Sequence, residues 1–473
     1  MDKQLLYRCI EEKAPLLTQL SDAIWEYAEL SMQEHRSAQA YLDILRAEGF
    51  TVEAELCGMP TAFLGKYGSG KPVIGILGEF DALSGLSQVA GKTQREWKIP
   101  GGSGHGCGHN LLGAASLGAA IAIKEQIAAG NLQGTVVFYG CPGEEGCAGK
   151  TFMARDGMFR DLDAALCWHP GDVNEVTTGS NAASVQVQYT FTGVSAHAAG
   201  DPEHGRSALD AAELMNIGVQ FLREHMPKSC GLHYSFLDAG GISPNVVQPT
   251  ATVLYMVRGN DVRIAKALLK RVDNIAQGAA MMTETSVSSR QIDGSSNTVS
   301  NSVLEKLLQE NLEQAPLPEY TQEELSFAAK LKETCGEPVL PGQWVNENTQ
   351  LQSFSKEASQ NGTLPLNNFV MPYTPSKQVS PGSTDVGDVS WLAPTAQFSA
   401  VTWVSGSPGH SWQNVSIGTH SIAHKGLLLA AKVLAGATMD LMENPETLRL
   451  CREEFEIATQ SGYDCPIGKE VTF

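Results

Sequence analysis

Cys107 and His109 stand two residues apart in the glycine-rich segment Gly104-His105-Gly106-Cys107-Gly108-His109. The glycine between them allows both side chains to turn toward one point with little steric cost. A thiolate and an imidazole together are good ligands for a transition-metal ion. The same segment is also compatible with a plain glycine-rich turn beside a buried thiol, so the spacing alone leaves both interpretations open.

Glu144 and Glu145 form an acidic pair in Gly143-Glu144-Glu145-Gly146, shortly after an apolar run that ends at Tyr139. Adjacent carboxylates on a turn point in different directions, so one can bind a cation while its neighbour holds a water beside it. A solvated acidic turn is the alternative interpretation. The position of the pair after an apolar run favours the first interpretation, in which one carboxylate binds a cation and the other holds a water.

Two histidines also follow apolar runs. His169 comes after the run 164–168 and precedes Pro170, which we expect to end a strand because proline cannot donate to a sheet interior. His410 follows the run 398–404. Taken singly, His169 could equally be a core histidine with its hydrogen bonds satisfied.

Asp81 follows the run 73–77 and is well suited to orient a ligand histidine from behind. In open α/β sheets, ligands bind outside the carboxyl ends of the strands, and each of the four predicted strand ends delivers a potential ligand or carboxylate. The candidate ligands are too many for one tetrahedral site and suit two ions that share a bridge, namely Cys107, His109, Glu145, His169 and His410.

The elements that must position these residues have an α/β pattern. Continuous apolar runs at 73–77, 135–139 and 164–168 alternate with helical segments at 111–129 and 150–159, which indicates a mostly parallel sheet with helices on both faces. After Gly179 two strand-helix-strand passages follow, with helices at 207–223 and 262–281, and indicate an inserted α+β domain of ferredoxin type.

We therefore predict a catalytic domain in two parts, residues 1–181 and 293–473, and an inserted domain over residues 182–292. The stretch 316–383 is rich in polar residues, Pro and Gly, and we expect it to be a long excursion near the mouth of the active site.

Composition excludes several classes of function. The chain has 33 basic and 52 acidic residues, a formal net charge of -19 and no basic run, so nucleic acid and anionic membranes are poor partners. The most apolar stretch, 111–123, is too short to span a bilayer and is expected to be a buried helix. The N-terminus lacks the features of a signal peptide, and the ten cysteines show no paired spacing, which favours a cytoplasmic location.

Four segments together resemble the amidohydrolase branch of the aminoacylase/carboxypeptidase metallopeptidases, and in the order of that family: Gly106-Cys107-Gly108-His109, Glu144-Glu145, Trp168-His169-Pro170 and Ser195-Ala196-His197. Within the branch, four more segments are similar to the p-aminobenzoyl-glutamate hydrolases: 141–146, 240–247, 383–391 and 423–426. One departure from the wider branch is Asn110, where many members carry Asp.

The resemblance implies a role for each matching residue. Cys107 would bridge two divalent ions, Zn²⁺ or Mn²⁺, His109 and His169 would complete one site, and Glu145 and His410 the other. Glu144 would be the general acid/base. The inserted domain would serve as lid and dimerisation domain. From it, His197 and Asn245 would reach the active site of the partner subunit to support the oxyanion, and Arg258 would bind the substrate carboxylate.

The reaction implied by the resemblance is hydrolysis of the amide bond of an N-acyl amino acid, with p-aminobenzoyl-glutamate as the first candidate substrate and other N-acyl amino acids or dipeptides as alternatives. Glu144 would take a proton from water, hydroxide would attack the carbonyl, and Glu144 would pass the proton to the leaving amine. The assembly would be a homodimer or a heteromer with a related chain. The second hypothesis is a non-catalytic partner in such a heteromer, and a Cys107 nucleophile with His109 as base is a third.

Overall fold

The computed structural model describes residues 2–472, which form two compact units. Unit 1 comprises the chain up to Gly179 together with Val299–Lys377 and Val389–Ser461. Unit 2 comprises Ser180–Thr298, Gln378–Asp388 and the chain from Gly462 on. Four segments that the sequence assigned to the catalytic domain group with unit 2, namely 180–181, 293–298, 378–388 and 462–472.

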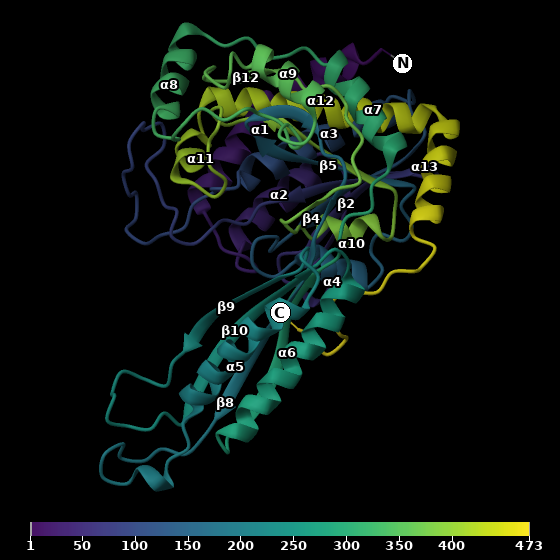
Figure 1. Ribbon diagram of the computed structural model, residues 1–473. Coiled ribbons are helices and arrows are strands. Elements are labelled where there is room, and N and C mark those ends of the chain that lie inside the picture. The colour runs from purple at the N-terminus through teal and green to yellow at the C-terminus, as the bar shows by residue number, and fades with distance from the viewer. Residues whose placement is uncertain (1, 473) are drawn as a thin grey trace. The chain divides into compact units, whose positions relative to one another are not determined.

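Unit 1 is a mixed α/β structure (Figure 1). Its strands are β1 (Thr51–Ala54), β2 (Phe63–Ser69), β3 (Val73–Glu79), β4 (Gly134–Cys141), β5 (Ala164–Gly171), β6 (Val173–Val176), β12 (Asn367–Val370) and β14 (Thr395–Val401). Its helices are α1 (Gln4–Tyr27), α2 (His35–Ala47), the 3-10 turn η1 (Leu56–Gly58), α3 (His109–Ala128), α4 (Gly149–Arg155), α7 (Ser302–Gln314), α8 (Gln322–Lys332), α9 (Thr349–Ala358), α11 (Trp412–Ile417), α12 (Ser421–Glu443) and α13 (Pro445–Ala458).

The eight strands of unit 1 form one sheet in the order β1-β2-β4-β3-β5-β14-β6-β12. Neighbouring strands in its central block, β4-β3-β5-β14, are all parallel. The pairs β1-β2, β2-β4 and β14-β6 are antiparallel, and β12 runs parallel to β6. The predicted mostly parallel sheet is confirmed. The carboxyl ends of the four central strands consequently lie at the same edge.

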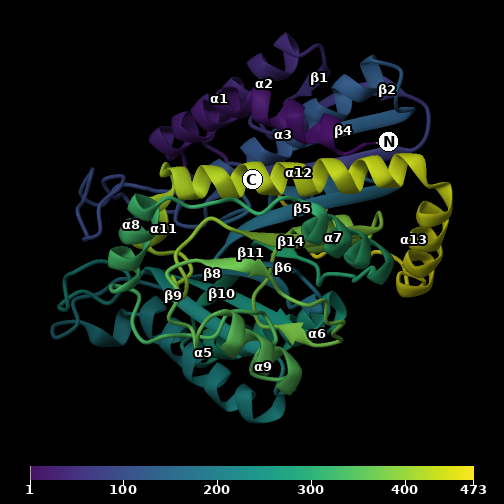
Figure 2. The same cartoon turned by 90° about the horizontal axis from the view of Figure 1, so that it is seen from above.

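Both faces of this sheet are covered. On β3, a side chain at Gly78 would lie 3.4 Å from the Cα atom of Gly113 in α3, whereas a side chain at Gly75 would lie 2.7 Å from Leu162, which follows α4. Because residues three apart on a strand face opposite sides, α3 covers one face and the segment after α4 the other. Helix α12 packs beside α3, and α1 packs on both (Figure 2).

Helices α3 and α12 are apolar over most of their circumference. Each is long and apolar enough to cross a membrane by length and composition alone, yet 83% of the relevant window is buried in each. Helices that are apolar on every side belong in the core of a large protein or in a membrane, and here they form the centre of the main core. The predicted helix at 111–123 is confirmed as buried, although α3 extends beyond that stretch to 20 residues.

Unit 2 has a four-stranded antiparallel sheet in the order β11-β8-β10-β9. Helices α5 and α6 lie along one face of this sheet (Figure 1). The chain order strand-helix-strand-strand-helix-strand is that of a ferredoxin-like fold, so the predicted inserted α+β domain is confirmed. The elements are β8 (Ala183–Thr192), α5 (Ala208–Leu222), β9 (Gly231–Asp238), β10 (Thr250–Gly259), α6 (Val262–Met282) and β11 (Ser286–Ser295).

Smaller elements complete unit 2. Strands β7 (Ser180–Asn181) and β13 (Val379–Ser380) form a parallel pair. The short elements η2 (Pro202–His204) and η3 (Arg223–His225) lie in its loops, and α10 (Val386–Ser390) begins in residues of unit 2 and ends in residues of unit 1.

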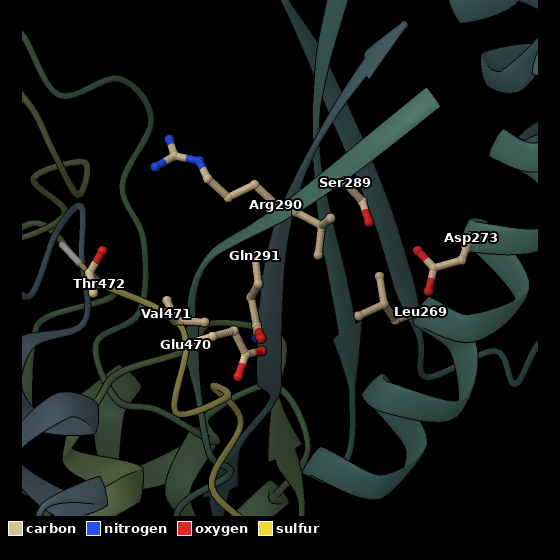
Figure 3. Close-up of a pocket in the computed structure, with 9 residues that line it drawn as sticks. Leu269, Asp273, Ser289, Arg290, Gln291, Glu470, Val471 and Thr472 are labelled. Carbon is tan, nitrogen blue, oxygen red and sulfur yellow. The ribbon is translucent and has the colours of Figure 1, made fainter. Parts of the chain in front are cut away.

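Residues 462–472 run beside the edge strand β11 of unit 2. Gln291 on β11 donates to the carbonyl of Pro466 at 2.7 Å, and Lys266 on α6 pairs with Asp464 at 2.6 Å. A pocket of about 310 Å³ lies between α6, β11 and Glu470–Thr472 (Figure 3). The segment thus covers part of the edge strand β11 through contacts with the Gln291 side chain.

The excursion 316–383 is more structured than its composition suggested. It contains α8, α9 and β12, and β12 extends the main sheet by pairing with β6. A capping box in which Thr321 and Glu324 exchange hydrogen bonds begins α8. Thr334, just after α8, accepts a hydrogen bond from Gln413 in α11, three residues beyond His410.

Candidate metal centre

The candidate ligands gather at the edge of the sheet where the four central parallel strands end. Glu79 closes β3, Glu144 and Glu145 follow β4, and His169 lies inside β5. The expected end of the strand before Pro170 is wrong, because β5 continues to Gly171. Beyond Leu166, β5 pairs with β14 and its pairing with β3 has ended, so Pro170 interrupts no ladder on that side.

Cys107, His109 and His169 form one cluster, in which one ligand atom of each residue lies within 4.8 Å of the others. The Sγ atom of Cys107 is 3.3 Å from Nε2 of His169. His109 is the first residue of α3, and Gly108 before it has a left-handed φ of 79°. A side chain at residue 108 would lie 2.9 Å from Pro170, so glycine lets the loop pass close to β5.

Both histidines of this cluster present Nε2 to Cys107. The Nδ1–H of His109 donates to Asp81 at 2.8 Å, and the Nδ1–H of His169 donates to the carbonyl of Pro170 at 2.7 Å. This arrangement fixes each ring and leaves its Nε2 lone pair for a cation. Burial, followed by the charge of His109, lowers the pKa of His169 to about 4, so its imidazole is neutral near pH 7.

Cys107, Glu145 and His410 form a second cluster, again with one ligand atom of each within 4.8 Å of the others. Oε1 of Glu145 is 3.4 Å from Nε2 of His410. Two of the buried candidate ligand atoms, Nε2 of His109 and Oε1 of Glu145, have no hydrogen-bond partner among the described residues. Buried polar atoms without partners are costly, and these two fit a cation on either side of Cys107.

The turn that carries Glu144 and Glu145 is held from outside. The backbone N–H of Glu145 donates to Asp81 at 3.0 Å, and that of Gly143 donates to Glu34 at 2.9 Å. Glu144 contributes an oxygen to a third group, with Glu79 and His109, whose atoms also lie within 4.8 Å of one another. The predicted base thus lies beside the predicted ligands.

Asp81 joins the two clusters. Its carboxylate accepts hydrogen bonds from His109, from the Ser31 hydroxyl at 2.9 Å and from the backbone of Glu145. Burial alone would raise the pKa of Asp81, but the hydrogen bond and charge of His109 lower it to about 2. A permanently ionised carboxylate therefore orients a residue of each cluster.

His410 lies in a loop that is tied to the Cys107 segment. His410 has a left-handed φ of 52°, and its side chain is 55% exposed. Asn414, 1% exposed, donates to the carbonyl of Gly106 at 3.0 Å and to that of Pro408 at 3.1 Å. Its amide therefore sets the distance between two ligand-bearing loops that are far apart in the sequence.

The predicted lid residues lie in unit 2, where the structure brings His197 and Asn245 together. Residues 197 and 246 form a β-bridge, and Ala198 donates to the carbonyl of Asn245 at 3.0 Å. Nδ1 of His197 accepts from the backbone N–H groups of Ala199 and Gly200. The neutral ring therefore carries its proton on Nε2 and can donate it to a ligand.

Arg258 lies on β10 of unit 2 and contacts the segment that begins the Ser383 motif. Its Nη1 donates to the Ser383 hydroxyl at 2.8 Å and to the carbonyl of Pro381 at 3.3 Å. Both bonds use the same nitrogen, so the remaining guanidinium donors can meet a carboxylate.

Asn110, which departs from the wider branch, does not face the clusters. Its Nδ2 donates to the Ser21 hydroxyl at 3.0 Å and to the carbonyl of Gly418 at 3.2 Å. The residue after His109 thus packs α3 against other helical segments. The substitution of Asp by Asn at this position leaves the arrangement around the ligands unaffected.

The structure also argues against a cysteine nucleophile. Burial raises the pKa of the Cys107 thiol, so the sulfur is protonated near neutral pH unless a cation holds it as thiolate. A metal ligand is the role that this environment favours.

Sequence reasoning missed three residues that hold the site: Glu34, Lys150 and Asn414. Each is buried and acts through partners distant in the sequence. Charged residues are rarely buried unless paired, and no local pattern marks these as exceptions. Glu79 stands at the end of an apolar run, but its type and position predicted no role, although its side chain lies within the group around Glu144.

Comparison with known proteins agrees with the resemblance. The family model for Peptidase family M20/M25/M40 matches residues 76–324. The chain is 42% identical to one of two p-aminobenzoyl-glutamate hydrolase subunits of Escherichia coli K12, over 99% of both chains. It is also 30% identical to the other of these two subunits, over 46% of this chain and 52% of that one.

A solved structure supports the fold. A dinuclear metal-binding peptidase of the M20 family from Bacillus subtilis, 17% identical, superposes with a TM-score of 0.55 over 92% of this chain and 99% of that one. The family match and the 42% identity over 99% of both chains agree with the candidate ligand groups at the sheet edge. The chain therefore belongs to Peptidase family M20/M25/M40 and is a hydrolase of amide bonds.

Proposed function

We propose that this protein hydrolyses p-aminobenzoyl-glutamate to p-aminobenzoate and glutamate at a centre of two divalent cations. The observation that supports this most is the sharing of Cys107 by two clusters, with His109 and His169 on one side and Glu145 and His410 on the other. The five residues are the ligands predicted from the sequence. Glu144 lies beside them as the proposed general base.

The donor set suits zinc or manganese. A thiolate favours zinc, whereas imidazole and carboxylate ligands also accept manganese. When bound, such cations supply Lewis-acid activation of water and of an amide carbonyl. We propose two ions of either metal per chain.

The protein's own residues provide the proton transfers. In the proposed reaction, Glu144 takes a proton from the attacking water and delivers it to the amine as the C–N bond breaks. His197, with its proton on Nε2, donates a hydrogen bond to the developing oxyanion, and Asn245 assists it. Asp81 keeps the ligands aligned throughout.

The substrate assignment rests on the relative whose name contains that substrate and on Arg258. The 42% identical E. coli relative matches 99% of the chain. In the proposal, Arg258 binds a carboxylate of the glutamate with the guanidinium donors that Ser383 and Pro381 leave available. Other N-acyl amino acids and dipeptides form the alternative substrate class.

A release assay tests the proposal. Purified protein with Zn²⁺ or Mn²⁺ is offered p-aminobenzoyl-glutamate, other N-acyl amino acids and dipeptides, and free amino acid is measured. We expect p-aminobenzoyl-glutamate to be the best substrate and Glu144→Gln to lower kcat by about 10²–10⁴-fold. The matched control is Glu337→Gln, an exposed glutamate of the same unit.

The outcomes separate the hypotheses. Equal rates for wild type and Glu144→Gln would remove Glu144 from the mechanism. Activity that survives removal of both metals by a chelator would revive the cysteine nucleophile. If no substrate is hydrolysed by the chain alone but activity appears with a related chain, the protein is a non-catalytic partner, as the occurrence of two related hydrolase subunits in E. coli would suggest.

Unit 2 carries a surface that suits association with a second copy, and we propose a homodimer formed there. Edge strand β9 exposes three apolar side chains, Tyr234, Phe236 and Leu237. Helix α5 exposes a stripe at positions i, i+3 and i+7, formed by Leu214, Ile217 and Phe221, the last of them 70% exposed. Exposed edges and apolar stripes of this kind are usually covered.

The oligomeric state tests this surface. The double change Ile217→Glu with Phe221→Glu should convert a dimer to a monomer in size-exclusion chromatography with light scattering. Met281→Glu, at an 81% exposed position on α6, is the control and should leave the dimer intact. A dimer that survives the double change would place the interface elsewhere. The predicted cytoplasmic location is retained as part of the proposal.

A further inference from the structure

Lys150 is a fully buried lysine beside the candidate metal centre. Its side chain is 0% exposed, and its Nζ lies 2.6 Å from Oε1 of Glu79, whose side chain is 3% exposed. Lys150 is the second residue of α4, and Glu79 is the last residue of β3. A buried ammonium is costly unless it is paired, so this contact is a specific feature of the site.

Glu79 places its second oxygen among the predicted catalytic groups. Oε2 is 3.3 Å from Nε2 of His109, and oxygens of Glu79 and Glu144 lie within 4.8 Å of each other. The other oxygen of Glu79 faces the ammonium of Lys150 at 2.6 Å, so one carboxylate links the buried lysine to the group around the proposed base.

Glu79, His109 and Glu144 have the composition of a further cation site, but Lys150 already supplies a positive charge there. An additional metal ion bound to Glu79 would lie close to an ammonium, and at such distances like charges repel strongly in a buried site. The lysine thus takes the place that a third cation could occupy.

The pair also fixes the turn that carries Glu144. The start of this turn is held by Glu34 through the N–H of Gly143, and its middle by Asp81 through the N–H of Glu145. Its end leads into α4, where Lys150 reaches back to β3. Glu144 therefore lies on a segment anchored before and after it by carboxylates from other parts of the chain.

We infer that Lys150 and Glu79 are positioning residues, which form a buried ion pair that aligns Glu144 and balances the negative charge of the metal centre. The alignment of Glu144 rests on the proposed function, whereas the charge balance concerns cation binding alone. The two parts can therefore be tested separately.

Cation affinity tests the charge balance without any substrate. Metal-free full-length protein is titrated with Zn²⁺ or Mn²⁺ in competition with a chromophoric chelator. Lys150→Met removes a positive charge and should bind cations at least as tightly as wild type. Glu79→Gln removes a negative charge near the cations and keeps the ammonium, so it should bind them at least about tenfold more weakly. The double variant should lie near wild type.

Steady-state kinetics test the alignment. With both sites loaded, Lys150→Met should lose at least about tenfold in kcat with KM within about threefold, because it removes the positive charge that faces Glu79 beside Glu144. The double variant Glu79→Gln with Lys150→Met should be more active than Lys150→Met alone. Because the double change can also restore stability, all rates are measured well below the melting temperature of every variant.

Lys124→Met is the matched control. Lys124 is also buried, with a side chain 9% exposed, and pairs with Glu48 at 3.0 Å near the far end of α3. Its loss should lower the melting temperature and leave cation affinity and kcat unchanged.

The inference is overturned if Lys150→Met and Glu79→Gln change cation affinity in the same direction, or if neither changes it. If Lys150→Met does not fold, Lys150→Arg keeps the charge and should keep wild-type cation affinity, and a folded Lys150→Arg with weakened affinity overturns it as well. An inactive wild type would refute the proposed function, while the cation titrations would still decide the charge balance.

Discussion

Asp81→Asn should weaken metal binding by about 10–100-fold. The two oxygens of Asp81 have separate tasks, since Oδ1 accepts from Nδ1 of His109 and Oδ2 accepts from Ser31 and from the backbone of Glu145. Asparagine has one acceptor oxygen and one NH₂ group, so it can serve only one side.

Each orientation of the new amide has a defined cost. If the amide oxygen points toward His109, the N–H of Glu145 faces the NH₂ group and loses its acceptor. In the opposite orientation the NH₂ group faces Nδ1 of His109, so the ring proton must move to Nε2. Nε2 can then no longer bind a cation. One unsatisfied buried hydrogen bond costs about 1–3 kcal/mol, which corresponds to about 5–150-fold in affinity.

Competition with a chromophoric chelator measures the change. Asp161→Asn, at an exposed position of unit 1, is the control and should bind as wild type does. If Asp81→Asn also binds metal with wild-type affinity, then Asp81 does not orient the ligands, and the link between the two clusters has no energetic weight.

Three further changes give distinct signatures. Asn110→Asp places a carboxylate against the carbonyl of Gly418, so thermal unfolding should reveal a loss of about 1–3 kcal/mol while metal analysis still finds full occupancy; loss of metal would contradict the geometry. Gly108→Ala must adopt a left-handed φ, so chelator competition should report weaker metal binding, and unchanged affinity would disprove the close approach. Burial raises the pKa of Glu305 from 4.5 to about 7, although the hydrogen bond from Tyr373 acts in the opposite direction. The stability that protonated Glu305 contributes is therefore fully present below pH 4.5 and is lost as the pH rises through 7. Glu305→Gln should therefore be up to about 3 kcal/mol more stable than wild type at pH 8.5 and equal to it below pH 4.5, and parallel melting-temperature profiles would refute this.

The sequence was most informative where a continuous run or a regular spacing of apolar residues predicted an element. The runs at 73–77, 135–139 and 164–168 are continuous because β3, β4 and β5 are covered on both faces, and the ligands follow from their position near the ends of such runs. Periodicity likewise located α6, whose buried residues recur at helical spacing.

Elements with few buried residues have no such pattern in the sequence. Strand β1 is largely exposed, and α8 lies in a polar stretch, so neither was predicted. The capping box at the start of α8 is the sequence signal that marks this helix. The partners of Lys150 and Asn414 are brought close only by the folded sheet edge. A single sequence gives residue types and spacing, whereas these contacts depend on long-range pairing.

The packing of residues 462–472 on unit 2 has a consequence for biosynthesis. The strands of that unit's main sheet have all been translated once the ribosome reaches Ser295, but the segment that covers β11 emerges more than 160 residues later. A nascent chain therefore displays an open β-edge during the synthesis of the rest of unit 1. Slow translation between β11 and this segment should favour aggregation through that edge, and a chaperone that shields it would raise the yield of soluble protein.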